Sequence, residues 1–414
     1  MAAEMQRDEW FRMKKIPLLI GGATTSRVHT AVKIAPHYEG PVVYVPDASR
    51  SVGVCSDLLS DERAAKTIAE LSADYLRVRE QHASKKASPL VTLAQARANK
   101  QAIAWAAYTP PVPRFLGHRE LRNFDLAEIA AHIDWTPLFQ TWDLAGRFPD
   151  ILRDQVVGTE ATRVFSDAKR MLQRLIEGRW LQAHGVVGLY PANTVDDDDI
   201  AFYADESRTE PLMVWHGLRL QTARPVIDGV MRANRCLADF IAPHGLKPDY
   251  AGMFALSIQG VEKKEARFLA DHDDYSAIML KALADRLAEA FAERLHQRVR
   301  TELWGYAAHE SLSNEELIAE KYRGIRPAPG YPACPDHQPK RDLFRVLDAG
   351  RIGMGLTESL AMTPAASVSG FYLAHPEAVY FNVGAIGIDQ LADWAARNAL
   401  DEASARRALA PQLA

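Results

Sequence analysis

The sequence predicts a mixed α/β protein, more closely an α+β protein, in which the end of a doubly wound domain precedes a domain of helices and antiparallel sheet. Residues 1–70 contain one strand, a glycine turn, a helix and a second strand, and little more. Parallel sheets of this kind are buried on both faces and normally contain more strands. Beyond them, apolar stripes at helical spacing alternate with short runs typical of strands.

The composition is that of a globular protein. The chain has 414 residues, 48% of them hydrophobic and 25% charged, which leaves room for two or three domains. No apolar run reaches the length of about eighteen residues that a membrane span needs, and the first residues lack the apolar core of a signal sequence. We therefore expect a soluble, cytoplasmic protein with no membrane partner. A net charge of -4 gives no reason to expect a nucleic-acid partner.

The first elements form one βαβ unit. Residues 16–20 are an apolar run that ends in two glycines, and Ser26 then begins a segment with apolar residues at helical spacing. Residues 41–45 are the second strand candidate. A loop over 46–52 and a helix-prone stretch over 53–79 should follow.

The expected domain boundaries follow from these elements. We assign residues 1–70 to the end of the doubly wound domain. Residues 71–88 are assigned to a linker, because the stretch QHASKKASP near its end is polar. Residues 89–414 form the second domain.

The second domain should contain one long helix and several strands. A helix is predicted over about 275–304, where apolar residues recur every fourth position from Leu283 to Leu303. The strand candidates are residues 185–190, 211–215, 249–257, 367–373 and 379–383. The last two flank His375-Pro376, which suggests an antiparallel hairpin.

A proline-rich stretch, residues 326–335 (RPAPGYPACP), is the most unusual feature. Four prolines stiffen the chain, and Gly330 permits a turn that a side chain would forbid. Arg326 at its head can clamp a carboxylate through two parallel hydrogen bonds. A rigid surface connection with a solvated arginine explains the same residues, and the pattern alone leaves both open.

Asp134, in the segment HIDWTP, also has two interpretations. Its carboxylate could pair with an ammonium or sulfonium group, or it could cap a helix that begins at Thr136. The second interpretation is favoured by the proline that follows Thr136.

Glu289, Glu293 and His296 lie at helical spacing and reproduce half of a di-iron carboxylate motif. No second Glu-x-x-His occurs, and the cysteines, Cys55, Cys236 and Cys334, are far apart. We therefore expect a solvated polar face and no metal site, although one of the glutamates could still reach a ligand.

Two loops remain. The glycine loop 21–26 and residues 47–50 each leave a predicted strand at its carboxyl end, where open α/β sheets bind ligands, although the glycines match no nucleotide fingerprint. Residues 196–199, four aspartates, should be a hydrated hairpin tip, because the glycine and the terminal glutamate of a calcium loop are missing.

Several stretches together resemble one family. Residues 326–335, 134–142 (DWTPLFQTW), 284–293 (ADRLAEAFAE) and 356–370 (LTESLAMTPAASVSG) resemble the activation domain of cobalamin-dependent methionine synthase. Residues 21–26 and 48–53 resemble the end of its cobalamin-binding domain. The resemblance covers essentially the whole chain in the family's order.

The resemblance implies a reactivation module of methionine biosynthesis, and so part of a methyltransferase. Such a domain binds S-adenosylmethionine in a shallow groove and supplies a methyl group to cobalamin that has been oxidised. By motif, Asp134 would meet the ammonium end of the ligand and Arg326 its carboxylate. The other implied contacts are Ala328, Gly330, Tyr331, Tyr380, Phe381 and, less closely matched, Glu289. No side chain is implied as catalytic, because a sulfonium is already an activated methyl donor.

The cobalamin site is implied only in part. Gly22, Thr24 and Ala48 would contact the nucleotide tail, but the family's Asp-x-His-x-x-Gly loop does not occur in this sequence. We expect cobalamin to bind only with a complementary chain or domain, either the remaining methionine synthase domains or a split-gene partner. The chain could equally be a truncated reading frame or a fragment. A reducing protein such as flavodoxin is a further implied partner.

Two alternatives belong to other classes. The chain could be a non-catalytic S-adenosylmethionine-binding module that regulates a partner chain. It could also be a free-standing small-molecule methyltransferase, but residues 21–26 fit the usual glycine-rich loop poorly and too little sheet follows them.

Overall fold

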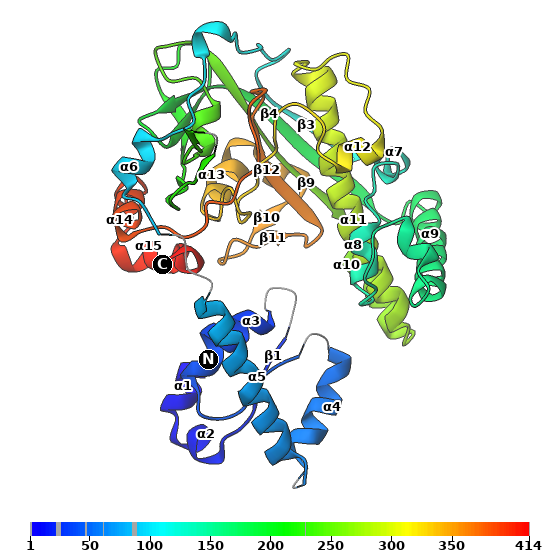
Figure 1. Cartoon of the computed structure of the whole chain (residues 1–414). Helices are drawn as coiled ribbons and strands as arrows, with labels where there is room; N and C mark the ends of the chain where they lie inside the picture. The colour runs from blue at the N-terminus through cyan, green and yellow to red at the C-terminus, as the bar shows by residue number, and fades with distance from the viewer. Residues whose placement is uncertain are drawn as a thin grey trace. The chain divides into compact units, whose positions relative to one another are not determined.

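The computed structural model describes residues 2–21, 26–45, 48–60, 62–84, 89–227 and 229–413. The chain divides into two compact units, Met1–Ser88 and Pro89–Ala414 (Figure 1). Each unit has its own hydrophobic core. No helix within the described ranges is both long enough and apolar enough to cross a membrane.

The first unit contains a parallel strand pair. Strand β1 (Leu18–Ile20) pairs with β2 (Val42–Tyr44). The Ser26 hydroxyl accepts a hydrogen bond from the His29 amide and so caps the helix between the two strands, which continues as a π-helical turn to Ile34. The helices of this unit are α1 (Ala2–Arg7), α2 (Glu9–Lys14), α3 (Arg27–His29), α4 (Ala48–Leu58) and α5 (Ala64–Ser84).

Helices extend further in this unit than the sequence suggested. Helix α4 begins at Ala48, inside the expected loop over 46–52, and α5 continues to Ser84, through most of the expected linker over 71–88. Residues 48–52 and 71–84 contain neither glycine nor proline, so nothing in their backbone opposes a helix. Polarity alone therefore did not exclude a helix in this segment.

The second unit is built on an antiparallel sheet. In the described part of the chain it has six strands in the order β12-β9-β4-β5-β6, and β3 also pairs with β4. Strand β4 is long enough to pair with both β3 and β5 along one edge, because its first half pairs with β3 and its second half with β5. The strands are β3 (Gly117–Phe124), β4 (Gln182–Val195), β5 (Asp199–Tyr203), β6 (Pro211–His216), β9 (Asp249–Gln259) and β12 (Ser367–Tyr372).

Strand β9 separates two cores. Phe254, Leu256 and Ile258 belong to the core on one face of the sheet, whereas Met253 and Ala255 belong to the core on the other face. Successive side chains of a strand point to opposite faces, so a strand covered on both faces is apolar throughout. This explains why residues 249–257 were recognisable as a continuous apolar run.

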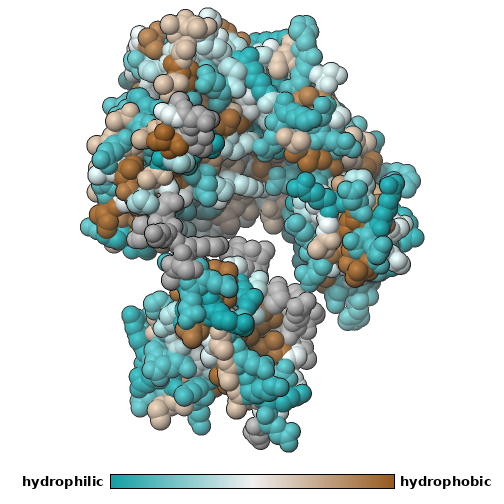
Figure 2. Space-filling view, in the orientation of Figure 1, coloured by the Kyte–Doolittle hydropathy of each residue, from teal (hydrophilic) through white to brown (hydrophobic). Residues whose placement is uncertain are grey.

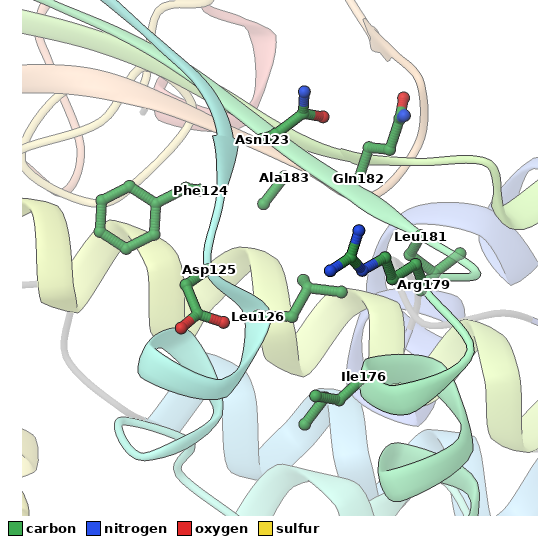
Figure 3. Close-up of a pocket in the computed structure, with 9 residues that line it drawn as sticks. All are labelled: Asn123, Phe124, Asp125, Leu126, Ile176, Arg179, Leu181, Gln182 and Ala183. Carbon is green, nitrogen blue, oxygen red and sulfur yellow. The ribbon is translucent and has the colours of Figure 1, made fainter.

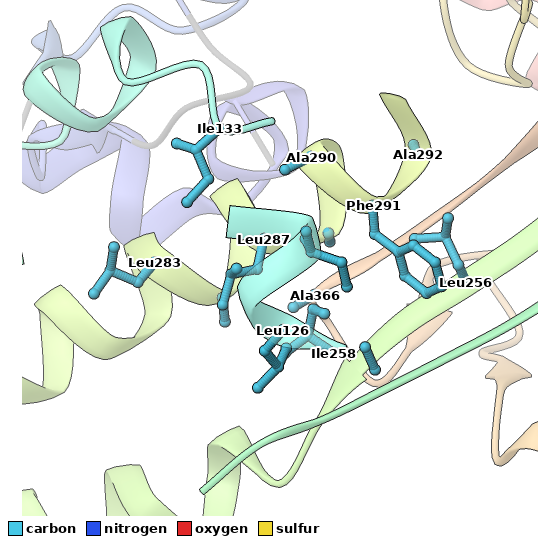
Figure 4. Close-up of a cluster of buried hydrophobic side chains, with 14 of the residues drawn as sticks. Leu126, Ile133, Leu256, Ile258, Leu283, Leu287, Ala290, Phe291, Ala292 and Ala366 are labelled. Carbon is cyan, nitrogen blue, oxygen red and sulfur yellow. The ribbon is translucent and has the colours of Figure 1, made fainter. Parts of the chain in front are cut away.

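The first face is covered by α11 (Asp274–Arg298), which continues as a π-helical turn, Val299–Leu303. Figure 4 shows Phe291 of this helix beside Leu256 of β9. The predicted helix over 275–304 is therefore confirmed almost to its ends. Its apolar stripe is what packs on the sheet.

The remaining helices surround this sheet (Figure 1). They are α6 (Leu93–Ala98), α7 (Leu126–Ala130), α8 (Thr136–Gln140), α9 (Gly158–Glu177), α10 (Val261–Ala270), α12 (Asn314–Ile318), α13 (Pro339–Val346), α14 (Ile388–Arg397) and α15 (Glu402–Ala408). Short strand pairs join β7 (Val226–Ile227) to β8 (Val230–Met231) and β10 (Gly355–Leu356) to β11 (Met362–Thr363). On the visible surface, hydrophobic residues form small groups separated by hydrophilic ones (Figure 2).

The predicted hairpin at His375-Pro376 is wrong. Residues 367–372 form β12, but residues 379–383 are not a strand. The Val383 amide donates to the Pro332 carbonyl, 2.9 Å away, and Val383 itself is buried against α14 and α15. The apolar side chains of this segment therefore serve a second small core and the proline-rich loop, and no sheet is needed to bury them.

The aspartate turn is also different from the expectation. It does join β4 to β5, but Asp198 and Asp199 are only 1% and 3% exposed. Asp198 accepts hydrogen bonds from the fully buried Arg219 at 2.6 Å and from Arg97 at 2.7 Å. Asp199 pairs with Arg397. The second half of the turn is therefore a buried ion-pair network, because arginines from three distant segments converge on it, whereas Asp196 is exposed and Asp197 half-buried, as a hydrated tip would be.

Candidate functional site

The proline-rich loop is anchored to the edge strand β12. Ile325 bridges Leu373, and the Phe371 amide donates to the Pro327 carbonyl at 2.9 Å. Gly370 on β12 permits this approach, because a Cβ atom there would lie 2.7 Å from the Pro327 carbonyl oxygen. The loop is therefore held against the sheet at its first residues.

Two tight turns shape the rest of the loop. The Tyr331 amide donates to the Ala328 carbonyl at 3.1 Å, and the Cys334 amide donates to the Tyr331 carbonyl at 2.9 Å. Gly330 is the third residue of the first turn, with φ +95°, a conformation that favours glycine. The stiff turn predicted at Gly330 is therefore present.

A cavity of about 410 Å³ opens between this loop, the sheet and α11. Six of the eight residues expected to bind the ligand line it: Glu289, Arg326, Ala328, Tyr331, Tyr380 and Phe381. The other lining residues were not among those eight. Pro327, Pro332 and Ala333 belong to the proline-rich stretch, and the remaining three are Phe254, Glu320 and Val368.

Arg326 is held at the wall of this cavity. Its side chain is 21% exposed, and its Nη1 atom lies 2.8 Å from the Glu293 carboxylate. Nη1 also donates to the Tyr322 hydroxyl at 2.9 Å, and the Arg326 amide donates to the Tyr380 hydroxyl at 2.9 Å. Burial is the largest single influence and works against the guanidinium charge, but Glu293 together with Tyr322, Tyr380 and Tyr372 outweighs it, so the pKa of Arg326 is raised.

The glutamate and histidine of α11 lie behind the arginine. Glu293 and His296 are 6% and 0% exposed, so the solvated face expected for them is wrong. Burial first, and then the charges of Arg300 and Arg326, lower the pKa of His296 well below its usual value. Across the described residues, no three or more His, Cys, Asp or Glu side chains gather as metal ligands would.

Two carboxylates line the cavity itself, those of Glu289 and Glu320. Glu289 and Tyr331 both line the cavity, and the charge of Glu289 is the largest of the causes that raise the pKa of Tyr331. Glu320 follows α12 with φ +54°. Nothing in the sequence distinguished it from the other charged residues of that segment.

The other predicted site residues lie elsewhere. Asp134 does not line the cavity, and its Oδ1 atom accepts a hydrogen bond from the Thr136 amide at the start of α8, 2.9 Å away. The N-cap position of α8 is Trp135, which makes no side-chain capping bond, so Asp134 closes a turn just before the helix and is not its N-cap. Gly330 shapes the loop without lining the cavity. Gly22 and Thr24 lie outside the described residues, as does the side chain of Ala48 at the start of α4.

A second, larger cavity of about 560 Å³ lies between α7, α9 and β4 (Figure 3). Its charged residues, Asp125 and Arg179, are both exposed, and Asp125 caps α7 by accepting a hydrogen bond from the Ala127 amide at 2.9 Å. It presents no desolvated charge to a ligand. The cavity beside Arg326 is the better candidate for that reason.

Comparison with known proteins agrees with this geometry. Residues 125–399 match the family model described as "Vitamin B12 dependent methionine synthase, activation domain". The sheet, α11 and the cavity are thus those of a domain that serves a methyltransferase. The chain belongs to the family of vitamin B12 dependent methionine synthase activation domains, as the sequence motifs indicated.

A solved structure is closely similar. The chain is 52% identical to the protein in "Crystal Structure of the MetH Reactivation Domain bound to AdoHcy", with a TM-score of 0.75. The match covers 78% of this chain and 99% of that one. The expected mixture of helices with an antiparallel sheet is confirmed by this likeness.

Proposed function

We propose that the cavity beside Arg326 binds S-adenosylmethionine as the methyl donor for reactivation of oxidised cobalamin. The observation that supports this proposal best is the arrangement of charges at the cavity, where Arg326 lies among the carboxylates of Glu289, Glu293 and Glu320. S-adenosylmethionine has the complementary groups, because a carboxylate, an ammonium and a sulfonium share one short side chain.

The charges favour a ligand that carries net positive charge. Glu293 already balances Arg326 behind the cavity wall, which leaves the carboxylates of Glu289 and Glu320 to face the ligand. In this proposal Arg326 takes the ligand carboxylate, and Glu289 and Glu320 favour the ammonium and sulfonium. Asp134 remains a predicted partner of the ammonium.

The shape of the cavity suits the rest of the ligand. Tyr331, Tyr380 and Phe381 present aromatic rings beside the rigid loop, and rings of this kind pack on the flat faces of an adenine. Ala328 and Gly330 would contribute backbone contacts. The similar domain described as bound to AdoHcy supports the assignment, since AdoHcy is what S-adenosylmethionine becomes when its methyl group leaves.

Reduced cobalamin supplies the nucleophile that accepts the methyl group. Of the residues expected to touch it, Gly22, Thr24 and the side chain of Ala48 fall outside what the structure describes, so we derive only the part played by the second unit. That part is positioning, because a sulfonium is an activated donor. A reducing protein such as flavodoxin is the proposed source of the electron.

The proposal is tested first by calorimetric titration of the 414-residue chain with S-adenosylmethionine. Saturable binding at one site is expected, and Arg341→Ala should leave it unchanged, because Arg341 is an exposed arginine on α13, away from the cavity lining. Absence of binding to the unaltered chain would refute the proposal.

Methyl transfer is tested separately. The 414 residues contain no Asp-x-His-x-x-Gly loop, so transfer to reduced cobalamin is expected only when a chain with that loop is added. Binding without transfer in the presence of that chain would favour the regulatory alternative. Methionine synthesis from homocysteine by the 414-residue chain alone would contradict the proposal.

A further inference from the structure

Glu293 is buried in an unusual way. It lies on α11 with 6% exposure, and its Oε1 atom has no hydrogen-bond partner in the described part of the chain. Oε2 lies 2.8 Å from Nη1 of Arg326. A buried ion pair adds little to stability over an apolar pair of the same size, so stability alone is a weak reason for this carboxylate.

Among the described residues, the hydrogen bonds and the ion pair of the Arg326 side chain meet at one corner of its guanidinium. Nη1 faces Glu293, donates to the Tyr322 hydroxyl at 2.9 Å and lies 3.4 Å from Nδ1 of His296. Among the residues that the structure describes, Nε and Nη2 take part in no hydrogen bond. These two atoms form one edge of the planar group, and such an edge is what binds a carboxylate through two parallel hydrogen bonds.

His296 supports this arrangement because it is uncharged. Its ring is stacked on Tyr372, with centroids 5.1 Å apart, and burial together with the nearby arginines keeps its pKa low. A protonated imidazole would repel Arg326 at this distance. A neutral one can accept a hydrogen bond from Nη1, and among the described residues it leaves Glu293 as the one carboxylate that pairs with the arginine.

We propose that Glu293 is a positioning residue, which holds the Nη1 corner of Arg326 so that the Nε–Nη2 edge meets the ligand carboxylate. This inference rests on the proposed function of the cavity. Without the Glu293 charge, the arginine should turn toward Glu289 or Glu320, the two carboxylates that line the same cavity. The clamp would then be lost although Arg326 is still present.

The test compares two ligands that differ in one group, S-adenosylmethionine and its decarboxylated analogue. In the unaltered chain, S-adenosylmethionine should bind more tightly, because the analogue lacks the carboxylate that Arg326 clamps. Glu293→Gln keeps the side-chain shape and removes the charge. We expect S-adenosylmethionine to bind about tenfold more weakly to this variant, with the analogue nearly unchanged.

Matched variants make the result specific. Glu262→Gln removes an exposed carboxylate from α10 and should change neither affinity. In an Arg326→Ala background, Glu293→Gln should not reduce the preference for the carboxylate any further, because the group that it positions is gone. Glu293→Asp keeps the charge and should retain part of the preference.

Several results would overturn the inference. An equal loss of affinity for both ligands would show that Glu293 is only structural, and an unchanged ratio of the two affinities would show that it does not orient Arg326. If Glu293→Gln does not fold, the ratio in Glu293→Asp decides, and a ratio equal to that of the parent overturns the proposal. Binding to the parent that depends on Arg326 but not on Glu293 would remove this inference and leave the proposed function intact.

Discussion

Replacing Arg326 by alanine separates the role of this residue in binding from its role in stability. The variant loses a charge-assisted clamp on the ligand carboxylate. Such contacts contribute about 2–4 kcal/mol to binding, which corresponds to about 30-fold to 700-fold in the dissociation constant. Calorimetric titration with S-adenosylmethionine measures this loss directly.

The same substitution should also destabilise the fold. Glu293 is left at 6% exposure without its counter-charge. Removing one partner of a buried ion pair costs about 3–5 kcal/mol, and we expect the lower end because the Arg326 side chain is 21% exposed. Urea unfolding of the variant measures this cost and shows the conditions in which it is folded for the titration.

One result would refute the assignment of Arg326. If the variant is folded and binds S-adenosylmethionine as tightly as the parent, Arg326 does not contact the ligand. Arg341→Ala, on the exposed face of α13, is the control for a general effect of lost positive charge.

Three further predictions concern other parts of the second unit. Gly330→Ala should lower the unfolding free energy by about 1–2 kcal/mol, because φ is +95° and the new Cβ would lie 2.2 Å from Cε1 of His337. An unchanged midpoint of urea unfolding would contradict this prediction. Burial raises the pKa of Asp249 to about 7, above its unfolded value of about 3.9, so its contribution to stability is complete below pH 4 and is lost as the pH rises toward 7. Asp249→Asn should therefore flatten the fall in unfolding free energy between pH 4 and 7, and equal slopes in both proteins would show that Asp249 does not titrate there. Asp198→Ala should lower the unfolding free energy, measured in urea, by about 3 kcal/mol, since Arg219 is fully buried and, within the described residues, keeps only Asp239 as its ionic partner. A loss below about 1 kcal/mol, which is what an exposed ion pair contributes, would mean that this network is solvated.

Much of the fold was predictable because its signals are local. The apolar run of β9 and the four-residue repeat of α11 reflect the burial of those elements, and each lies within one continuous segment. Residues 379–383 carried a similar apolar signal and are not a strand. Hydrophobicity reports that a segment is buried, but not what covers it.

The candidate site shows the same division. Residues 326–335 were recognisable because prolines and glycine constrain their own backbone, and the loop indeed lines the cavity. Glu320 gave no signal, since a carboxylate at the end of a short helix is usually solvated. Glu293 was noticed and then assigned to a solvated face, which its burial contradicts.

The sequence by itself determined the stiff turn at Gly330, the presence of an arginine at the head of the loop and the family to which the chain belongs. Only the tertiary structure decided that Arg326 meets Glu293 of α11, and that Asp198 is buried against Arg219. The physical reason is range. Backbone preference and hydrophobic period act between neighbours in the chain, whereas the partner of a charge depends on which distant elements the packing of the core brings together.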